Sequence, residues 1–250
     1  MMRVTVVGSG DAFGSGGRFS TCLHVEGGRA PMLIDCGASS LVALNAPHAA
    51  HIDRNAIDAI LFTHFHGDHF GGLPFFVLDG QFNTRRARDL TIAGPKGVEA
   101  RARAAMETFF PGSFDAPRTF ALRFVEVSPC APAQLAGLTI EAFAMVHDER
   151  AGPCQGYRVS DGAKTFAYSG DTAWCDALPE LTRDADVALL ECYFASAMNS
   201  PAHLDAPTLM RRRAELSARR LIVTHMGASM LAPGAPDPGE RAFDGMTIDI

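Results

Sequence analysis

The chain has 250 residues, of which 47% are hydrophobic and 20% charged, so it is long enough to bury a substantial core. Its formal net charge of −6 disfavours a protein that wraps nucleic acid through many phosphate contacts. No signal peptide or membrane-spanning window is visible and the six cysteines form no Cys-x-x-Cys pair, so we expect a cytoplasmic protein with reduced thiols, no membrane contact and one domain over residues 1–250.

Short apolar runs recur along the chain, and several end at a residue that can bind metal or transfer a proton. The first runs, 3–8, 20–26 and 30–35, predict a hairpin-like start. Five later runs end at such residues: 57–63 at His64, 139–146 at His147, 165–170 at Asp171, 187–190 at Glu191 and 221–224 at His225. Such runs are typical of strands buried on both faces. Because sites in layered α/β folds form beyond the carboxyl ends of strands, we expect these side chains to share one cleft.

Helices are predicted between the strands, at residues 71–78, 97–109 and 206–219. The last begins with Asp205 as a candidate N-cap and Pro207 in its first turn. Residues 231–240, rich in Pro and Gly, predict a loop, and 245–250 could return as an edge strand. Strands that alternate with helices, together with the hairpin-like start, predict an α/β protein with mixed sheets.

Residues 63–69 read Thr-His-Phe-His-Gly-Asp-His and carry the strongest chemical signal of the chain. His64 and His66 stand two apart, so on an extended segment both side chains point to one side. Gly67 permits a sharp turn that presents Asp68 and His69 nearby. Imidazole nitrogens and carboxylate oxygens suit zinc, with manganese or iron as alternatives. The motif therefore predicts a metal site.

Taken in order, several segments resemble the metallo-β-lactamase superfamily, and within it the RNase Z-like branch. They are 6–13 with Gly16-Gly17-Arg18 behind it, 33–37 (Leu-Ile-Asp-Cys-Gly), 63–69, 168–172 (Tyr-Ser-Gly-Asp-Thr) and Thr224-His225. The resemblance covers most of the chain. It implies an α/β fold of four layers, an αββα sandwich of two mixed β-sheets, and hydrolase chemistry at a pair of divalent metal ions.

Carried over residue by residue, the resemblance implies seven metal ligands in two sets that share one carboxylate. They are His64, His66 and His147 for the first ion, Asp68, His69 and His225 for the second, and Asp171 as the bridge between them. Two cations about 3.5–4 Å apart share a water, lower its pKa and clamp the attacking and leaving oxygens. Asp68 is expected to serve in catalysis as well. The assignment of His147 as a ligand is based on its order in the chain and its neighbours alone, and the alternative is that it is an ordinary loop histidine.

The resemblance also implies a general acid. His203, in Ala202-His203-Leu204-Asp205, stands where RNase Z-like members have a histidine that donates a proton to the leaving oxygen. Those members usually read His-Ser-Thr there, and Glu191 lies in Glu-Cys-Tyr-Phe where they read His-Glu-Ala-Thr. Our hypothesis is that His203 is catalytic and that Glu191 orients it. A polar residue at the start of a helix is the alternative for His203.

Two further features have competing interpretations. Phe70, Phe75 and Phe76 could line a pocket, although apolar residues beside a buried strand usually belong to the core. The run Arg211-Arg212-Arg213 is more typical of a solvated helix face than of a phosphate clamp. Neither feature changes the expected chemistry.

The leading hypothesis is a binuclear hydrolase that uses a metal-bridging hydroxide on a phosphodiester or related ester. Endonucleases that process tRNA 3′ ends carry a long arm between the ligands equivalent to His147 and Asp171, whereas only 24 positions separate these residues here. We therefore expect a small-molecule ester as substrate and disfavour nucleic acid. A tRNA 3′-end endonuclease and a non-enzymatic metal-binding member remain as alternatives, and a homodimer is left open.

Overall fold

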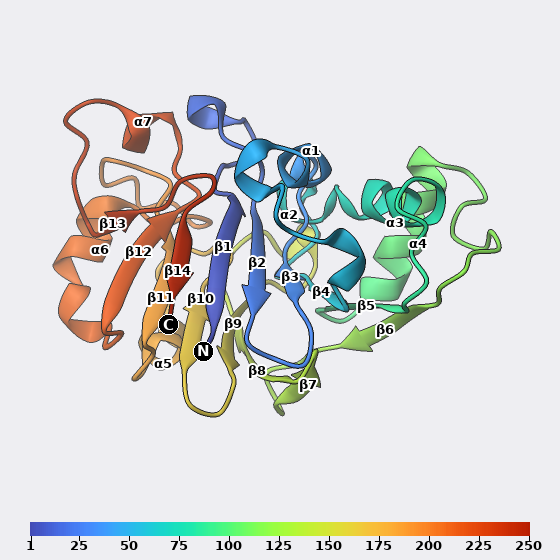
Figure 1. Cartoon of the computed structure of the whole chain (residues 1–250). Coiled ribbons are helices and arrows are strands. Elements are labelled where there is room, and N and C mark those ends of the chain that lie inside the picture. Colours follow the sequence, from blue (N-terminus) through green and yellow to red (C-terminus); the bar gives the residue numbers. More distant parts are fainter.

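The computed structural model describes residues 1–250 and contains two seven-stranded β-sheets that pack face to face (Figure 1). The first sheet contains, in the order in which they pair, β14 (Thr247–Asp249), β1 (Arg3–Gly8), β2 (Cys22–Glu26), β3 (Met32–Ile34), β4 (Ala59–Leu61), β5 (Leu90–Gly94) and β6 (Leu122–Glu126). The second contains β13 (Glu240–Arg241), β12 (Arg220–Thr224), β11 (Val187–Glu191), β10 (Thr165–Tyr168), β9 (Gln155–Ser160), β8 (Leu138–Ala144) and β7 (Ala133–Leu135). Each sheet combines three antiparallel with three parallel pairings, so the mixed sheets predicted from the sequence are confirmed.

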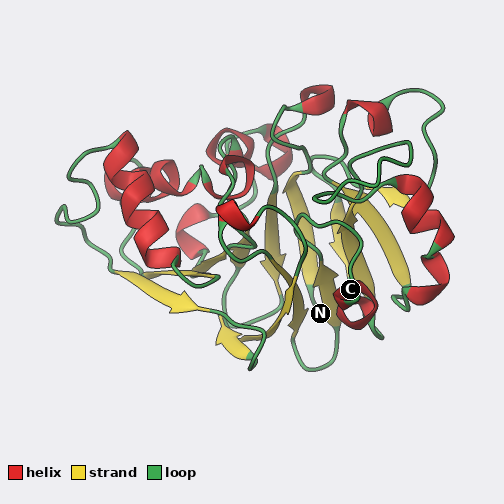
Figure 2. Ribbon diagram, turned by 180° about the vertical axis from the view of Figure 1, so that it is seen from behind, coloured by secondary structure: helices red, strands yellow, loops and turns green.

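The helices lie around the strands (Figure 2). They are α1 (Ser40–Leu44), α2 (Gly67–Phe70), α3 (Leu73–Phe82), α4 (Val98–Phe109), α5 (Ala177–Thr182), α6 (Ala206–Arg211) and α7 (Ala228–Leu231), with short 3-10 turns η1 (Ser15–Gly17), η2 (Pro47–Ala49), η3 (Arg54–Ala56), η4 (Glu149–Ala151) and η5 (Arg213–Glu215). None of the helices combines the length and the apolar character needed to cross a membrane.

Three apolar clusters separate four layers. One lies between the two sheets, a second between the first sheet and α1 to α4, and a third between the second sheet and α5 to α7. In β11, Val187 and Leu189 face the other sheet, whereas Ala188 and Leu190 face the helices. Because side chains alternate along a strand and both faces are covered, the run is apolar throughout. The four-layer αββα arrangement is therefore confirmed.

Two predicted helices have the wrong extent. The helix expected at 71–78 is α3, which begins at Leu73 and ends at Phe82. Gly71-Gly72 separates it from α2, and a Cβ at Gly72 would lie 2.3 Å from the carbonyl oxygen of Gly37. The helix expected at 206–219 ends at Arg211, and the chain turns so that Leu216 and Ala218 enter the third apolar cluster. Strand β4 is also shorter than the run 57–63 that predicted it.

The remaining elements agree with the sequence. The helix predicted at 97–109 is α4, and Asp205 caps α6 by accepting a hydrogen bond from the backbone N–H of Thr208 at 2.8 Å. Residues 232–239 form the expected loop. Strand β14 pairs with β1 at the edge of the first sheet, so both chain termini lie side by side (Figure 1).

Candidate metal centre

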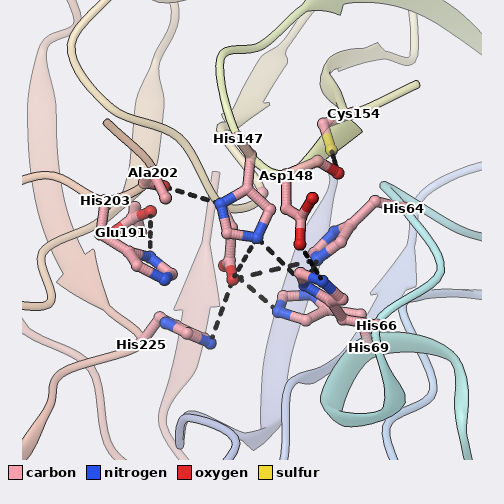
Figure 3. Close-up of polar contacts among 12 residues, drawn as sticks. His64, His66, His69, His147, Asp148, Cys154, Glu191, Ala202, His203 and His225 are labelled. Carbon is pink, nitrogen blue, oxygen red and sulfur yellow. Dashed lines mark hydrogen bonds and ion pairs between the residues drawn. The ribbon is translucent and has the colours of Figure 1, made fainter. Parts of the chain in front are cut away.

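The five strand ends singled out in the sequence meet at one edge of the two sheets. They are His64 beyond β4, His147 beyond β8, Asp171 beyond β10, Glu191 at the end of β11 and His225 beyond β12. Figure 3 shows the imidazoles of His64, His66, His69 and His147 turned toward a common centre, with His225 facing them from the other side. The structure thus gathers the sequence-predicted site residues around one cleft, which six of them line.

Close approach of two loops shapes the segment that follows β4. The first turn of α2 carries Asp68 and His69. The backbone N–H of Cys36 donates to the carbonyl oxygen of His69 at 2.7 Å, which joins this turn to the loop after β3. A Cβ at Gly37 would lie 2.0 Å from the carbonyl oxygen of Asp68, so only glycine permits this approach.

Three imidazole nitrogens form the first candidate ligand group, made by His64, His66 and His147. Nδ1 of His66 lies 3.1 Å from Nε2 of His64 and 3.1 Å from Nε2 of His147. Nitrogens that bind one zinc ion tetrahedrally at about 2.0–2.1 Å stand about 3.3 Å apart. The spacing of this group therefore fits a common cation.

Four buried residues form the second group, and their ligand atoms are equally close. Nε2 of His225 lies 3.1 Å from Oδ2 of Asp68, and Nε2 of His69 lies 3.6 Å from the same oxygen. Oδ1 of Asp171 is 3.2 Å from Nε2 of His69. The group contributes two carboxylates and two imidazoles, a donor set that suits a divalent cation.

Asp171 stands between the two groups. Its Oδ2 atom lies 4.0 Å from Nε2 of His64, 3.8 Å from Nε2 of His147 and 3.4 Å from Nε2 of His225. The residue is 3% exposed and therefore has little access to water. This position is the one that a bridging carboxylate would require.

Unpaired polar atoms provide an independent test of whether the site fits metal ions. Nε2 of His69 and Oδ1 of Asp171 are buried and make no hydrogen bond, although they lie 3.2 Å apart. A buried polar atom without a partner costs free energy, and native proteins rarely leave two of them side by side. A cation between these atoms would satisfy both, so the residues present fit the group.

Outer hydrogen bonds orient three of the candidate ligands. Oγ1 of Thr63 meets Nδ1 of His64 at 3.0 Å, Oδ2 of Asp35 meets Nδ1 of His69 at 2.8 Å, and the carbonyl oxygen of Ala202 meets Nδ1 of His147 at 2.7 Å. Each contact occupies one ring nitrogen and leaves Nε2 for the centre. Sequence reasoning quoted Asp35 in a motif but assigned it no role. The sequence feature that could have identified Asp35 is an acidic residue directly after a buried strand.

Histidines of the two ligand groups differ in the direction of their pKa shifts, because only the second group contains carboxylates that offset burial. Burial lowers the pKa of His64, and its imidazole neighbours lower it further. Burial also acts to lower the pKa of His69, but the carboxylates of Asp171 and Asp35 outweigh it and raise that pKa. Protons and cations compete for the same nitrogen, so metal binding at the second group would release protons.

A family model described as a Beta-lactamase superfamily domain matches residues 31–226, which is well over half of the chain. The protein belongs to this family. The resemblance noted in the sequence is thereby confirmed, together with the metallo-β-lactamase fold.

Several proteins to which this chain is similar carry the names of hydrolases. The probable metallo-hydrolase YhfI of Bacillus subtilis (strain 168) is 25% identical over 231 residues, which cover 90% of this chain and 87% of that protein. Ribonuclease Z of Lachnoclostridium phytofermentans is 32% identical over 160 residues, 64% of this chain and 48% of that protein. A diphosphatase from the PhnP family has the same fold, with a TM-score of 0.74 and 19% identity over 100% of this chain and 98% of that one. These comparisons support a hydrolase of the metallo-hydrolase superfamily.

His203 and Glu191 form a pair beside the ligand groups (Figure 3). Nδ1 of His203 lies 2.9 Å from Oε1 of Glu191. The Glu191 carboxylate is fully buried and also accepts hydrogen bonds from the backbone N–H of Thr172 on Oε1 and from that of Leu204 on Oε2. These donors favour the carboxylate form of Glu191. Burial acts to lower the pKa of His203, but the hydrogen bond and charge of Glu191 outweigh it and raise the pKa to about 9. Burial also raises the pKa of the Glu191 carboxyl, and the hydrogen bond between Nδ1 and Oε1 favours a protonated imidazole paired with the carboxylate.

The candidate ligands line a cavity of about 480 Å³. Its walls are Ala12, Phe13, His66, Gly67, Asp68, His147, Asp171, Tyr193, His203 and His225. Phe13 and Tyr193, the two aromatic walls, were not predicted, although both stand in segments quoted from the sequence, because nothing in those segments assigned them a role. The suggestion that Phe70, Phe75 and Phe76 line this pocket is wrong. Phe70 and Phe76 are buried in the second apolar cluster, and Phe75 packs against Phe109 and Phe110.

The arginine run lies outside the metal pocket. Arg212 stacks on Trp174 at 4.1 Å and pairs with Glu215 at 2.7 Å. Arg211 and Arg212 line a neighbouring cavity of about 320 Å³ that touches the metal pocket only through His203. The run is therefore not a clamp on a phosphate bound at the candidate ligands.

Proposed function

We propose that the protein is a binuclear metal-dependent hydrolase that acts on a phosphodiester or related ester of a small molecule. The observation that carries this proposal is geometric. Two groups of ligand atoms lie on either side of Asp171, and Asp171 and His203 line the same cavity. We assign His64, His66 and His147 to one ion, Asp68, His69 and His225 to the other, and Asp171 to both. Zinc suits these donors, with manganese or iron as alternatives.

When bound, such cations supply a water acidified toward neutral pH and positive charge beside the phosphoryl oxygens. The chain supplies the remaining functions. Asp68 lines the cavity and directs Oδ2 toward His225, which leaves Oδ1 available to accept a proton from the attacking water.

His203 is the proposed general acid. Its Nδ1 is engaged by Glu191, so Nε2 is the nitrogen from which a proton can reach the leaving oxygen. Glu191 touches no part of the cavity and is a positioning residue, which holds the ring and keeps it protonated. Cations beside His203 would lower its pKa from about 9 toward the working range of an acid catalyst.

A small substrate is supported by the segment between His147 and Asp171. This stretch consists of η4 and the paired strands β9 and β10, which belong to the second sheet, and leaves no protruding arm. A cavity of about 480 Å³ is in the range that binds small molecules. The alternative is an RNA endonuclease, which the 32% identity to a ribonuclease Z favours.

Metal analysis and turnover measured on the same preparations test the proposal. We expect about two divalent ions per chain and hydrolysis of bis(4-nitrophenyl) phosphate in the wild type, and loss of both metal and turnover in Asp171→Ala. Full metal content and normal turnover in that variant would contradict the bridging role.

A panel separates the candidate functions. Small phosphodiesters, sulfate esters, lactones and a tRNA precursor should be compared at equal enzyme concentration. Specific cleavage of the precursor at nanomolar enzyme, without comparable activity on any small ester, would select the endonuclease instead. Metal binding without turnover of any substrate would select a non-enzymatic role.

A further inference from the structure

Phe13 combines two properties that rarely occur together. It lines the metal cavity, yet the residue is 81% exposed, more than any other large apolar residue except Met1. Leaving an aromatic ring in water forgoes the free energy of burial. An exposed ring at the wall of a reaction cavity is therefore a candidate surface for a substrate.

The backbone that carries Phe13 is held in place. Asp11 is 1% exposed, and its Oδ1 atom accepts hydrogen bonds from the backbone N–H groups of Phe13 at 3.2 Å and Ser15 at 2.9 Å. The following turn η1 packs on α7, since a Cβ at Gly16 would lie 2.8 Å from Cδ1 of Leu231. The ring is thus presented from a braced loop, which lowers the entropic cost of binding against it.

Tyr193 supplies the second aromatic surface of the cavity. Its ring stacks on His203 with centroids 4.9 Å apart and an interplanar angle of 27°. Behind it, a Cβ at Gly227 would lie 3.0 Å from Cε1 and Cζ of the tyrosine, so the ring has no room to move backward. The ring is therefore fixed beside the proposed general acid.

The other cavity walls restrict what can bind these rings. Apart from the candidate ligands and His203, the walls are Ala12, Gly67 and the two aromatics, and no Lys or Arg is among them. Apart from His203, a second phosphate would find no side chain that could carry positive charge. A neutral planar ring would find the exposed ring of Phe13 to stack on, with the ring of Tyr193 as a further aromatic wall.

We propose that Phe13 and Tyr193 bind a planar ring of the substrate, so that the substrate is a phosphodiester of a nucleoside. This inference depends on the proposed function and gives its substrate class. The phosphoryl group lies at the candidate ligands, and the base stacks against Phe13. A polyanionic RNA strand is the poorer match, because the cavity walls offer no lysine or arginine to further phosphates.

The inference can be tested without turnover by measuring, with calorimetry, the affinity of the metal-loaded protein for two monoesters that resemble reaction products. Thymidine 5′-monophosphate carries a base, and ribose 5-phosphate does not. Since base–aromatic stacking contributes about 1–3 kcal/mol per base, we expect Phe13→Ala to weaken binding of the nucleotide about fivefold or more. Binding of ribose 5-phosphate should change less than about twofold.

Phe82→Ala serves as the matched control, because Phe82 is 69% exposed and lies outside the cavity. It should leave both affinities unchanged. Equal affinities of the wild type for the two monoesters, or an unchanged nucleotide affinity in Phe13→Ala, would overturn the inference while diester hydrolysis persisted. A lower oligomeric mass of Phe13→Ala in sedimentation would assign the ring to a contact between chains and also overturn it. Absence of any diester hydrolysis would instead contradict the proposed function.

Discussion

Replacing Asp35 by Asn should weaken metal binding at the second ligand group without changing any proposed ligand. Asp35 is fully buried and accepts hydrogen bonds on both oxygens. Oδ1 accepts from the backbone N–H of Thr63 at 2.8 Å, and Oδ2 receives Nδ1 of His69 at 2.8 Å. An amide has only one acceptor oxygen, so in Asp35→Asn an NH2 group must face a donor in either orientation.

The expected loss of metal affinity can be estimated from this mismatch between the amide and its two hydrogen-bond donors. Mutating an outer partner of a metal-bound histidine costs about 10–100-fold in metal affinity. That range corresponds to about 1.4–2.7 kcal/mol. We expect the larger loss at the second group, because Asp35 contacts His69 directly and reaches His64 of the first group only through Oγ1 of Thr63.

The assay is a zinc titration of metal-free protein in competition with a chromophoric chelator. Asp186→Asn is the matched control, since Asp186 also accepts a backbone N–H, that of Thr165 at 3.0 Å, but lies at the opposite end of β10 from Asp171. The control should keep both affinities. Unchanged zinc affinity in Asp35→Asn, or equal losses in the two variants, would refute this reasoning.

Three further changes have defined outcomes. His203→Ala should keep the metal content but lose much of the hydrolysis rate on esters with poor leaving groups. The rate on 4-nitrophenyl esters should fall far less, because an activated leaving group needs little proton donation. Equal losses of rate on both kinds of ester would count against a general acid. Gly37→Ala should lower the metal content of the purified protein, since its Cβ would collide with the backbone of Asp68. Leu189→Ala should destabilise the fold by about 2–5 kcal/mol in denaturant unfolding, whereas exposed Val42→Ala should change it by less than about 0.5 kcal/mol.

The strands and the motif at residues 63–69 could be predicted from the sequence, because they depend on residues that are close to one another along the chain. The run that forms β11 is apolar on both faces because one face meets the other sheet and one meets the helices. The motif at 63–69 predicted four neighbouring ligand-type side chains because a strand end and one helical turn suffice to place them. These elements are local, so sequence periodicity and spacing describe them directly.

Features that depend on distant loops could not be predicted in the same way. Asp35 adopts a left-handed φ of 59° to reach His69, and a short motif does not indicate that conformation. Phe13 and Tyr193 share a cavity only because the loops after β1 and β11 meet beside the ligands. Phe75, which was a candidate wall, instead finds Phe109 and Phe110 at the end of α4. Such pairings are tertiary, and single-residue propensities do not contain them.

The central claim is that two cations share Asp171, and anomalous diffraction from crystals grown with zinc tests it most directly. An anomalous difference map recorded above the zinc edge should contain two peaks per chain. One should lie among His64, His66 and His147 and the other among Asp68, His69 and His225, with Asp171 in contact with both. A single peak, or two peaks of which either lacks contact with Asp171, would contradict the account.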